Sequence, residues 1–312
     1  MVKLVFCGTP EFAVAALEAV IAAGHEVALV VTQPDRAAGR GMQTQVGAVK
    51  AAALRHGLPV VQPEKIKRNE DFRAQLEAIA PDAILVVAYG RIIPDWMLAL
   101  PRYGCINLHG SLLPKYRGAA PVQWAVANGE TETGVTTMRL DAGLDTGDVL
   151  LERRVPVGPD ATAAALFSQL SKIGAGLVIE TLAGLADGTV TRKPQDHSGA
   201  TLAPILTRED GRMELTERTA AEAYNRWRGF YPWPGAHGAF RGKRFLVHRM
   251  RVFEGESGLP AGALDWSGGE LVAGAAEGTA LILDEVQLEG KQRLTGMDFV
   301  RGFQLKQGEI LD

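Results

Sequence analysis

Short apolar, β-branched runs alternate in the first half of the chain with alanine-rich segments whose apolar residues recur at helical spacing. The short runs predict buried strands, and the longer segments predict helices. The expected strands are 2–6, 27–31, 83–88 and 104–109, and the expected helices are 11–23, 46–56 and 72–79. Strands and helices in alternation predict an α/β domain with a parallel sheet and helices on both of its faces.

Two more strands and a long helix complete this first domain. The strands, 134–140 and 148–155, are joined by a loop at 141–147. An alanine- and leucine-rich helix is expected at 161–186, ending at a glycine.

Beyond that helix the pattern changes. A polar stretch predicts a linker, and short β-like runs separated by glycine-rich turns then favour a small all-β barrel. These runs are 245–252, 271–273 and 280–286. We therefore divide the chain into a first domain at 1–189, a linker at 190–207 and a second domain at 208–312.

Two polar side chains lie at the end of the expected strand 104–109, where the carboxyl edge of a parallel sheet places its ligand site. Asn107 and His109 are two residues apart, so both point to the same side of the sheet. An amide can donate a hydrogen bond to a developing oxyanion and an imidazole can move a proton near neutral pH, a combination that suits acyl-type transfer. The pair also fits a capped strand-end histidine beside a turn residue, and the spacing leaves both interpretations open.

Three aspartates lie between the last two strands of the first domain: Asp141, Asp145 and Asp148. Asp145 could orient His109 and stabilise its charged form, although an ordinary Asp/Gly turn explains the same residues. Ser111 suggests a serine hydrolase in which His109 is the base. The surrounding sequence lacks the Gly-x-Ser-x-Gly elbow of such enzymes, which favours a hydrogen-bonding role for Ser111.

Several function classes are disfavoured. The turn Gly8-Thr9-Pro10 keeps only the first glycine of a dinucleotide fingerprint, and no P-loop is present. Cys7 and Cys105 lie in apolar runs, and no Cys/His cluster has ligand spacing, so we expect no metal. No apolar run approaches the ~20 residues of a membrane span. The N-terminus lacks a secretory signal, so we expect a cytoplasmic protein without a membrane partner.

The net charge of −3, from 33 basic and 36 acidic residues, means that nucleic-acid binding would need a local basic patch. The stretch 223–253 contains seven basic residues, interleaved with aromatic ones, and no Asp or Glu. The basic residues are Arg226, Arg228, Arg241, Lys243, Arg244, Arg249 and Arg251. Uncompensated charge on a small barrel favours a groove for a nucleic-acid backbone, whereas the alternative is an aromatic core with a solvated arginine rim. Arg36 and Arg40 form a second, weaker basic loop.

Several motifs together resemble the methionyl-tRNA formyltransferase family over almost the whole chain. They are FCGTPEF at 6–12, TQPDR at 32–36, VVAYG at 86–90, INLHGSLLPKYRGAAP at 106–121, GVT at 134–136, GLDTGD at 143–148 and YPWPGA at 231–236. The Asn-x-His, Ser-Leu-Leu-Pro and downstream Asp are shared by transferases that use 10-formyltetrahydrofolate. The Gly-Thr-Pro start, the Arg/Gly loop and the Pro-Trp-Pro segment separate the tRNA enzymes from the glycinamide ribonucleotide enzymes, and less decisively from sugar-nucleotide formyltransferases.

The resemblance implies a Rossmann-like, parallel-sheet formyltransferase domain followed by a small OB-like β-barrel domain that binds tRNA. It implies that Asn107, His109 and Asp145 are catalytic. The implied folate-binding residues are Val87, Tyr89, Gly90, Ser111, Leu112, Leu113, Pro114 and Asp141. The expected tRNA contacts are Arg36 and Arg40 in a loop that reaches the acceptor end, with Arg241, Lys243 and Arg244 in the second domain.

The implied reaction transfers the formyl group of 10-formyltetrahydrofolate to the α-amino group of methionyl initiator tRNA, giving N-formylmethionyl-tRNA for translation initiation. Direct attack by the amine requires neither a metal nor a covalent enzyme intermediate, and no obligate protein partner is implied. A sugar-amine formyltransferase would instead act on a nucleotide-linked amino sugar. An RNA-binding module would bind tRNA without folate-dependent turnover.

Overall fold

The computed structural model describes residues 1–38, 43–255 and 257–312, and its chain divides into two compact units. The first unit consists of Met1–Pro121, Glu132–Pro156 and Leu166–Pro204, and the second consists of Val122–Thr131, Val157–Ala165 and Ile205–Asp312. This division differs from the one expected from the sequence. Most of the expected linker, residues 190–204, lies in the first unit, because its backbone is hydrogen-bonded there.

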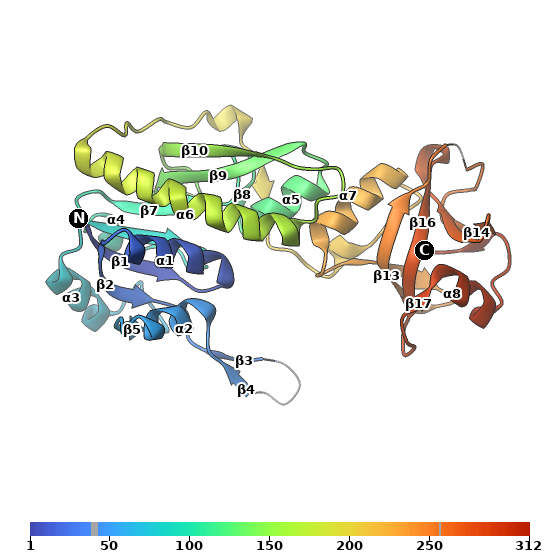
Figure 1. The fold of residues 1–312 in the computed structure, drawn as a ribbon, viewed down its shortest axis with the longest axis horizontal. Helices are drawn as coiled ribbons and strands as arrows, with labels where there is room; N and C mark the ends of the chain where they lie inside the picture. The colour runs from blue at the N-terminus through green and yellow to red at the C-terminus, as the bar shows by residue number, and fades with distance from the viewer. Residues whose placement is uncertain (39–42, 256) are drawn as a thin grey trace. The chain divides into compact units, whose positions relative to one another are not determined.

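A seven-stranded sheet in the order β10-β9-β7-β6-β1-β2-β5 forms the first unit (Figure 1). The strands are β1 Lys3–Gly8, β2 Glu26–Val31, β5 Val60–Val61, β6 Ala83–Val87, β7 Cys105–His109, β9 Glu132–Arg139 and β10 Val149–Pro156. The expected parallel pairing holds from β5 across to β7. β9 is antiparallel to β7 and β10, because a short loop joins it to β10 and such connections favour antiparallel pairing. The predicted fold class is confirmed, with this hairpin added at one edge.

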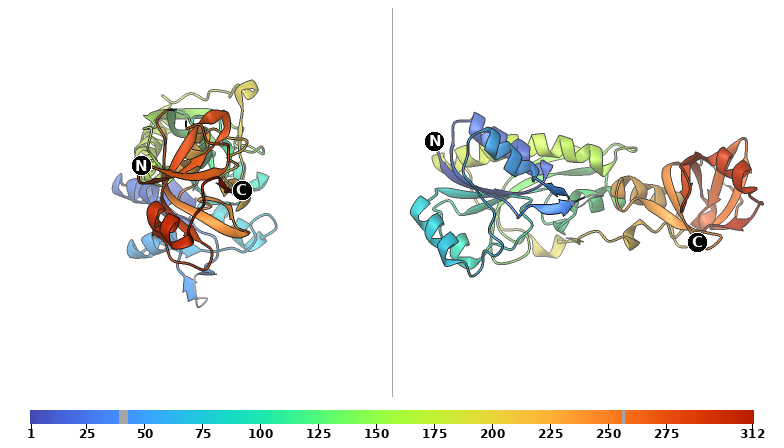
Figure 2. Two further views of the ribbon diagram at one scale, coloured as in Figure 1. Left: turned by 90° about the vertical axis from the view of Figure 1, so that its right-hand side faces the viewer. Right: turned by 90° about the horizontal axis from the view of Figure 1, so that it is seen from below.

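Helices cover both faces of that sheet. They are α1 Val14–Ala22, α2 Ala48–Arg55, α3 Glu70–Ile79, α4 Asp95–Leu98 and α6 Ala163–Asp187. The helix α5, Pro121–Ala127, precedes β9 in the chain, and most of it belongs to the second unit. The right-hand view of Figure 2 shows α1 and α6 on one face, with α3 and α4 on the other. Phe72 and Leu76 of α3 and Met97 of α4 share one buried core with Val5 and Val86 of the sheet. No helix in the described part of the chain is long and apolar enough to cross a bilayer.

Two short strand pairs lie outside the main sheet. β3 (Arg36–Ala38) pairs with β4 (Gln43–Gln45) as an antiparallel hairpin. β8 (Arg117–Gly118) pairs in parallel with β11 (Leu202–Ala203). Short 3₁₀ helices occur at η1 Glu11–Ala13, η2 His197–Gly199, η3 Glu209–Gly211 and η4 Ala276–Gly278.

The second unit contains a nearly closed antiparallel barrel in the order β12-β13-β16-β15-β14-β18, with β17 beside β16. Its elements are α7 Ala220–Phe230, β12 Ala236–Phe240, β13 Lys243–Val252, β14 Ala263–Ser267, β15 Glu270–Gly274, β16 Ala280–Leu288, β17 Leu294–Thr295, α8 Gly296–Phe303 and β18 Glu309–Ile310. Reciprocal backbone hydrogen bonds between Ala239 and Asp312, at 2.8 and 3.0 Å, bring the two ends of the sheet together. Phe240, Phe245 and Phe299 pack edge to face in the core. The predicted small barrel is thereby confirmed.

Candidate active site

Strand β7 presents the candidate amide and imidazole on one face of the sheet. Leu108 points toward α6, because a Cβ added to Gly174 would lie 2.7 Å from Leu108 Cδ2. Alternation along the strand therefore places Asn107 and His109 on the opposite face, the one covered by α3 and α4. Both side chains are nearly buried, with 9% and 5% exposure for Asn107 and His109.

The structure brings His109 and Asp145 together from distant parts of the chain. His109 Nδ1 lies 3.7 Å from Asp145 Oδ2, and His109 Nε2 lies 2.9 Å from the carbonyl oxygen of Tyr116. The same Asp145 oxygen accepts a hydrogen bond of 2.8 Å from the backbone N–H of Gly118. Both ring nitrogens therefore face oxygen atoms, with Nε2 within hydrogen-bond distance of its partner and Nδ1 within ion-pair distance.

The loop between β9 and β10 holds Asp145 in an unusual backbone conformation. Asp145 has φ 51°, in the left-handed region that few residues other than glycine occupy. The carboxylate of Asp141 accepts hydrogen bonds from the Gly143 N–H at 3.0 Å and the Thr146 hydroxyl at 2.7 Å. A Cβ on Gly147 would lie 1.7 Å from the Arg139 carbonyl oxygen, so this position admits only glycine. Asp141, expected to bind folate, thus organises the loop that carries Asp145.

The segment after β7 is fixed by its own hydrogen bonds. The Ser111 hydroxyl donates to the Lys115 carbonyl at 2.6 Å, and the Thr136 hydroxyl donates to the Ser111 carbonyl at 2.7 Å. The Leu113 N–H donates to Thr136 Oγ1 at 3.3 Å. The nitrogens of His109 are directed at other oxygens, so the geometry favours the hydrogen-bonding role for Ser111 over the nucleophilic one. Leu112 and Pro114, the remaining expected folate contacts here, are half-buried.

Tyr89 and Gly90, two further expected folate contacts, line a cavity of about 550 Å³ beside the turn after β1. Gln33 Nε2 donates to the Tyr89 carbonyl at 2.8 Å and fixes this stretch of backbone. The Tyr89 side chain is buried, and its hydroxyl has no hydrogen-bond partner within the part of the chain that is described. Burial, with a smaller contribution from Cys7, raises the pKa of Tyr89. Val87 is fully buried within β6, so its side chain shapes the wall from behind.

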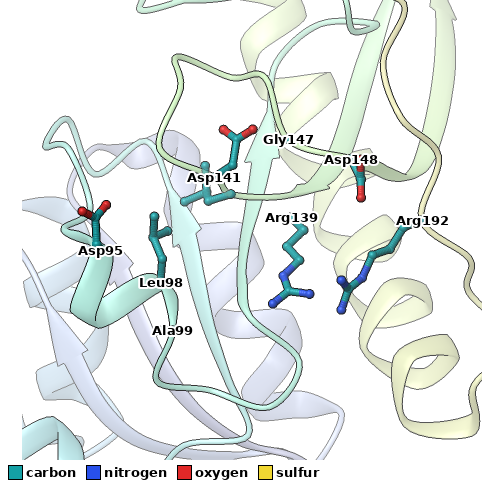
Figure 3. Close-up of a pocket in the computed structure, with 9 residues that line it drawn as sticks. Asp95, Leu98, Ala99, Arg139, Asp141, Gly147, Asp148 and Arg192 are labelled. Atoms are coloured by element: carbon teal, nitrogen blue, oxygen red, sulfur yellow. The ribbon is translucent and has the colours of Figure 1, made fainter.

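A second cavity, of about 410 Å³, lies between α4 and the loop that carries Asp145. Figure 3 shows the guanidinium groups of Arg139 and Arg192 side by side in this cavity, with Asp141 in the loop above them. Burial, and next the charge of Arg192, lowers the pKa of Arg139. Sequence analysis missed both arginines, because one follows a strand pattern and the other lies in the expected linker. Asn107 and His109 line neither of these two cavities.

The first expected tRNA-binding loop can be placed only in part. Arg36 begins β3, whose hairpin partner is β4. Arg40 lies outside the described residues. At the base of the hairpin, Lys50 Nζ contacts Asp35 Oδ2 at 2.5 Å and Gln62 Oε1 at 2.6 Å.

The expected basic stretch is largely compensated, which corrects the expectation of seven unpaired charges. Arg241 forms a two-pronged ion pair with Glu309, at 2.8 and 2.7 Å. Arg251 is bound by Glu270, and Arg249 lies 3.7 Å from Asp284. These acids follow residue 253 in the sequence, and barrel pairing returns them to the same surface.

Two other arginines of that stretch serve the fold. Arg228 is 4% exposed and donates to the Asn225 side chain and to the carbonyls of Gly158 and Ala161. Arg226 donates to the Asp210 carbonyl at 2.9 Å. At the start of β13, Lys243 is exposed and Arg244 is half-buried. Fewer unpaired positive charges are therefore accessible than the sequence suggested.

Within residues 1–38, 43–255 and 257–312, no group of three or more His, Cys, Asp or Glu side chains is arranged to hold a metal ion.

Comparison with known proteins gives consistent matches over both units. Family models described as "Formyl transferase" and "Formyl transferase, C-terminal domain" match residues 2–182 and 205–304. A methionyl-tRNA formyltransferase of Acidobacterium capsulatum is 63% identical over 96% of each chain. One from Geobacter sulfurreducens is 46% identical, covering 99% of this chain and 96% of the relative.

Solved structures share the fold at low identity. An N-formyltransferase from Helicobacter canadensis, in complex with folinic acid and dTDP-3-aminofucose, has a TM-score of 0.65 at 17% identity and covers 91% of this chain and 99% of its own. HypX from Aquifex aeolicus in complex with tetrahydrofolic acid has a TM-score of 0.63 at 18% identity, covering 100% of this chain and 50% of its own.

Proposed function

The chain belongs to the methionyl-tRNA formyltransferase family, and from that premise we propose that Asn107, His109 and Asp145 catalyse formyl transfer. The reaction of this folate-using family formylates methionyl-tRNA for translation initiation. We further assign the α-amine of methionyl initiator tRNA as acceptor and 10-formyltetrahydrofolate as donor. The contact between the buried His109 side chain and the half-buried Asp145 side chain, at 3.7 Å, is the observation that carries the proposal.

The folate donor supplies the formyl carbon, and its N10 leaves as an amine. The methionyl nitrogen forms the new C–N bond and loses one proton, while the departing nitrogen gains one. The Asn107 amide donates to the formyl oxygen as negative charge develops on it. His109 moves the proton between the two nitrogens, and Asp145 stabilises the ring while it is charged. The amine is itself the nucleophile, so the chain contributes hydrogen bonds and proton transfer without a metal or a covalent intermediate.

We assign the folate, a bicyclic ligand with a tail, to the region that the expected folate residues border. The two cavities, of about 410 and 550 Å³, fall in the ~300–1,000 Å³ range of ligand sites. Tyr89 and Gly90 border one cavity and Asp141 the other, while the 111–114 backbone lies just after His109. We assign Val87, Leu112, Leu113 and Pro114 to the apolar wall, and Ser111 to its internal support.

For tRNA, we assign the sequence segment with Arg36 and Arg40 to the acceptor end, and the barrel to the body of the tRNA. Lys243 and Arg244 are the preferred barrel contacts, and Arg241 contributes less because Glu309 neutralises it. Residues 1–189 then carry out the chemistry, 208–312 bind tRNA and 190–207 connect them. The chain would act in the cytoplasm, where charged initiator tRNA is found, without a membrane or an obligate protein partner.

The decisive assay measures formylation with 10-formyltetrahydrofolate and charged initiator tRNA, beside uncharged tRNA and a nucleotide-linked amino sugar. Turnover is expected only with the charged tRNA. Asn107→Ala should lower kcat by ~10²–10³-fold, the usual cost of one oxyanion donor. His109→Gln should be similarly impaired. His56→Gln is the matched control, because His56 contacts Glu18 in another histidine–carboxylate pair away from the site. Turnover of the amino sugar instead would reject the acceptor assignment.

A further inference from the structure

Residues 193–203, which we call the strap, run across the candidate site instead of connecting two domains loosely. Lys193 and Val149 exchange reciprocal backbone hydrogen bonds of 2.9 Å beside the start of β10. At the other end, the Arg117 N–H donates to the Thr201 carbonyl at 2.8 Å, and the Tyr116 N–H donates to the Thr201 hydroxyl at 2.9 Å. The strap is therefore hydrogen-bonded near both of its ends. Its Thr201 end is attached to Tyr116, whose carbonyl contacts His109.

One side chain in the middle of the strap reaches the loop that carries Asp145. Gln195 is 7% exposed, and its Nε2 donates to the carbonyls of Asp145 at 2.9 Å and Gly147 at 2.7 Å. These two carbonyls flank the turn in which Asp145 has φ 51°. A loop that would otherwise offer its carbonyls to water is instead held by a single buried amide.

Arg117 fixes which way that amide points. Its Nε and Nη2 lie 3.2 and 2.7 Å from Gln195 Oε1, and its Nη2 also donates to His197 Nδ1 at 3.1 Å. A guanidinium can only donate, so the amide oxygen must face Arg117 and the NH₂ group must face the loop. Arg117 is itself 6% exposed, which makes both partners expensive to leave unpaired.

The strap also supports the backbone at residues 116–118, which contacts both His109 and Asp145. β11 lies so close to β8 that a Cβ on Gly118 would be 2.6 Å from the Ala203 carbonyl oxygen. Gly118 donates to Asp145 Oδ2, and the neighbouring Tyr116 carbonyl faces His109 Nε2. Both oxygens that contact the imidazole are therefore held by elements that the strap fixes.

We propose that Gln195, oriented by Arg117, is a positioning residue that holds Asp145 against His109. The inference rests on the proposed role of Asp145 and extends the catalytic unit into the expected linker. Loss of the amide donor frees the two loop carbonyls, and Asp145 moves away from the ring that it stabilises. A displacement of about 1 Å in such a pair costs up to ~10²-fold in rate.

Gln195→Glu is the most specific test, because it keeps the side-chain length and an acceptor for Arg117 but turns a carboxylate oxygen toward two carbonyls. We expect kcat to fall ~10–100-fold with little change in the KM for either substrate. A variant that merely weakened ligand binding would instead raise a KM, so the split between kcat and KM identifies positioning of the reacting groups. Asp196→Asn is the matched control, because Asp196 is exposed on the same strap and its carboxylate accepts hydrogen bonds from the N–H and hydroxyl of Ser198, away from Asp145.

Thermal unfolding of each variant separates positioning from folding. If Gln195→Glu does not fold, Gln195→Asn keeps the amide at a shorter reach and should show a smaller loss of kcat, again with little change in KM. A folded Gln195→Glu or Gln195→Asn enzyme with wild-type kcat would overturn the inference. So would a loss of activity that appears as a higher KM at unchanged kcat.

Asp145→Asn distinguishes this inference from the proposed function. If Asp145→Asn is impaired and the Gln195 variants are normal, the inference alone fails. If Asp145→Asn is fully active, the catalytic role of Asp145 fails and the inference falls with it. In the Asp145→Asn background, Gln195→Glu should reduce kcat less than twofold further, because both changes disrupt the same contact.

Discussion

At the scale of single residues, the pairing of Arg241 with Glu309 makes a testable statement about stability and pH. The two-pronged hydrogen bond from Arg241 lowers the pKa of Glu309 from 4.5 to about 2. Because the folded-state value is the lower one, the pair stabilises the fold fully above about pH 4.5 and loses that effect as the pH falls toward 2. Arg241→Gln should therefore lower the unfolding temperature at pH 6 and have a shrinking effect in acid. Denaturation curves at several pH values measure this, and a constant difference across the range would contradict it.

The sequence indicates the candidate site residues far better than the residues that hold them in place. The family motifs single out Asn107, His109 and Asp145 as candidates, and the structure brings His109 and Asp145 together. Gln195 carries no such signal, because a glutamine in a polar stretch looks the same whether it faces water or two buried carbonyls. The sequence likewise did not indicate that Glu309 neutralises the charge of Arg241, because the two residues are 68 positions apart along the chain.

At the scale of elements, two glycines of α6 have opposite surroundings and give a matched pair of variants. A Cβ on Gly174 would meet Leu108, which lies between the two candidate residues of β7, whereas a Cβ on Gly176 would meet nothing within 4 Å. Gly176→Ala should stabilise the protein by about 0.5–1 kcal/mol through helix propensity alone. Gly174→Ala should destabilise it and lower kcat, because the Leu108 side chain must move out of its packed position between the two candidate residues. Chemical denaturation and formylation assays would contradict this if both variants behaved alike.

A network of half-buried hydrogen-bonded side chains, Lys50, Asp35 and Gln62, lies at the base of the hairpin β3–β4. The hydrogen bond from Lys50, and next that from Gln62, lowers the pKa of Asp35, which lies just before β3. Lys50→Met should release the base of the hairpin and raise the KM for charged tRNA several-fold, with kcat at saturation nearly unchanged. Lys65→Met, on an exposed lysine between β5 and α3, is the control. An unchanged KM in Lys50→Met would show that the hairpin does not need this anchor.

Elements were predictable where local pattern determines them, and less so where tertiary pairing does. The buried strands β1, β6 and β7 follow from runs of apolar residues. The helix α7 was not predicted, although Thr219 and Glu222 form a capping box at its start. The orientation of β9 and the docking of the strap follow from long-range hydrogen bonds instead. Thr201, for example, bonds to Tyr116 and Arg117, more than 80 residues earlier, and nothing in its local sequence indicates that partner.

At the scale of the whole molecule, tRNA binding must overcome a net charge of −3, so the balance between paired and accessible cations decides it. Within the described residues, no carboxylate forms an ion pair with Lys243, whereas Arg251 is bound by Glu270. Lys243→Gln should weaken tRNA binding and reduce the slope of log K against log salt by ~1, because one phosphate contact is lost. Arg251→Gln should change that slope much less, since removing a neutralised cation leaves Glu270 unpaired but alters no phosphate contact. Filter binding of charged tRNA over a salt series measures both slopes. Equal changes in the two variants would mean that ion pairing on the barrel surface does not decide which cations contact the RNA.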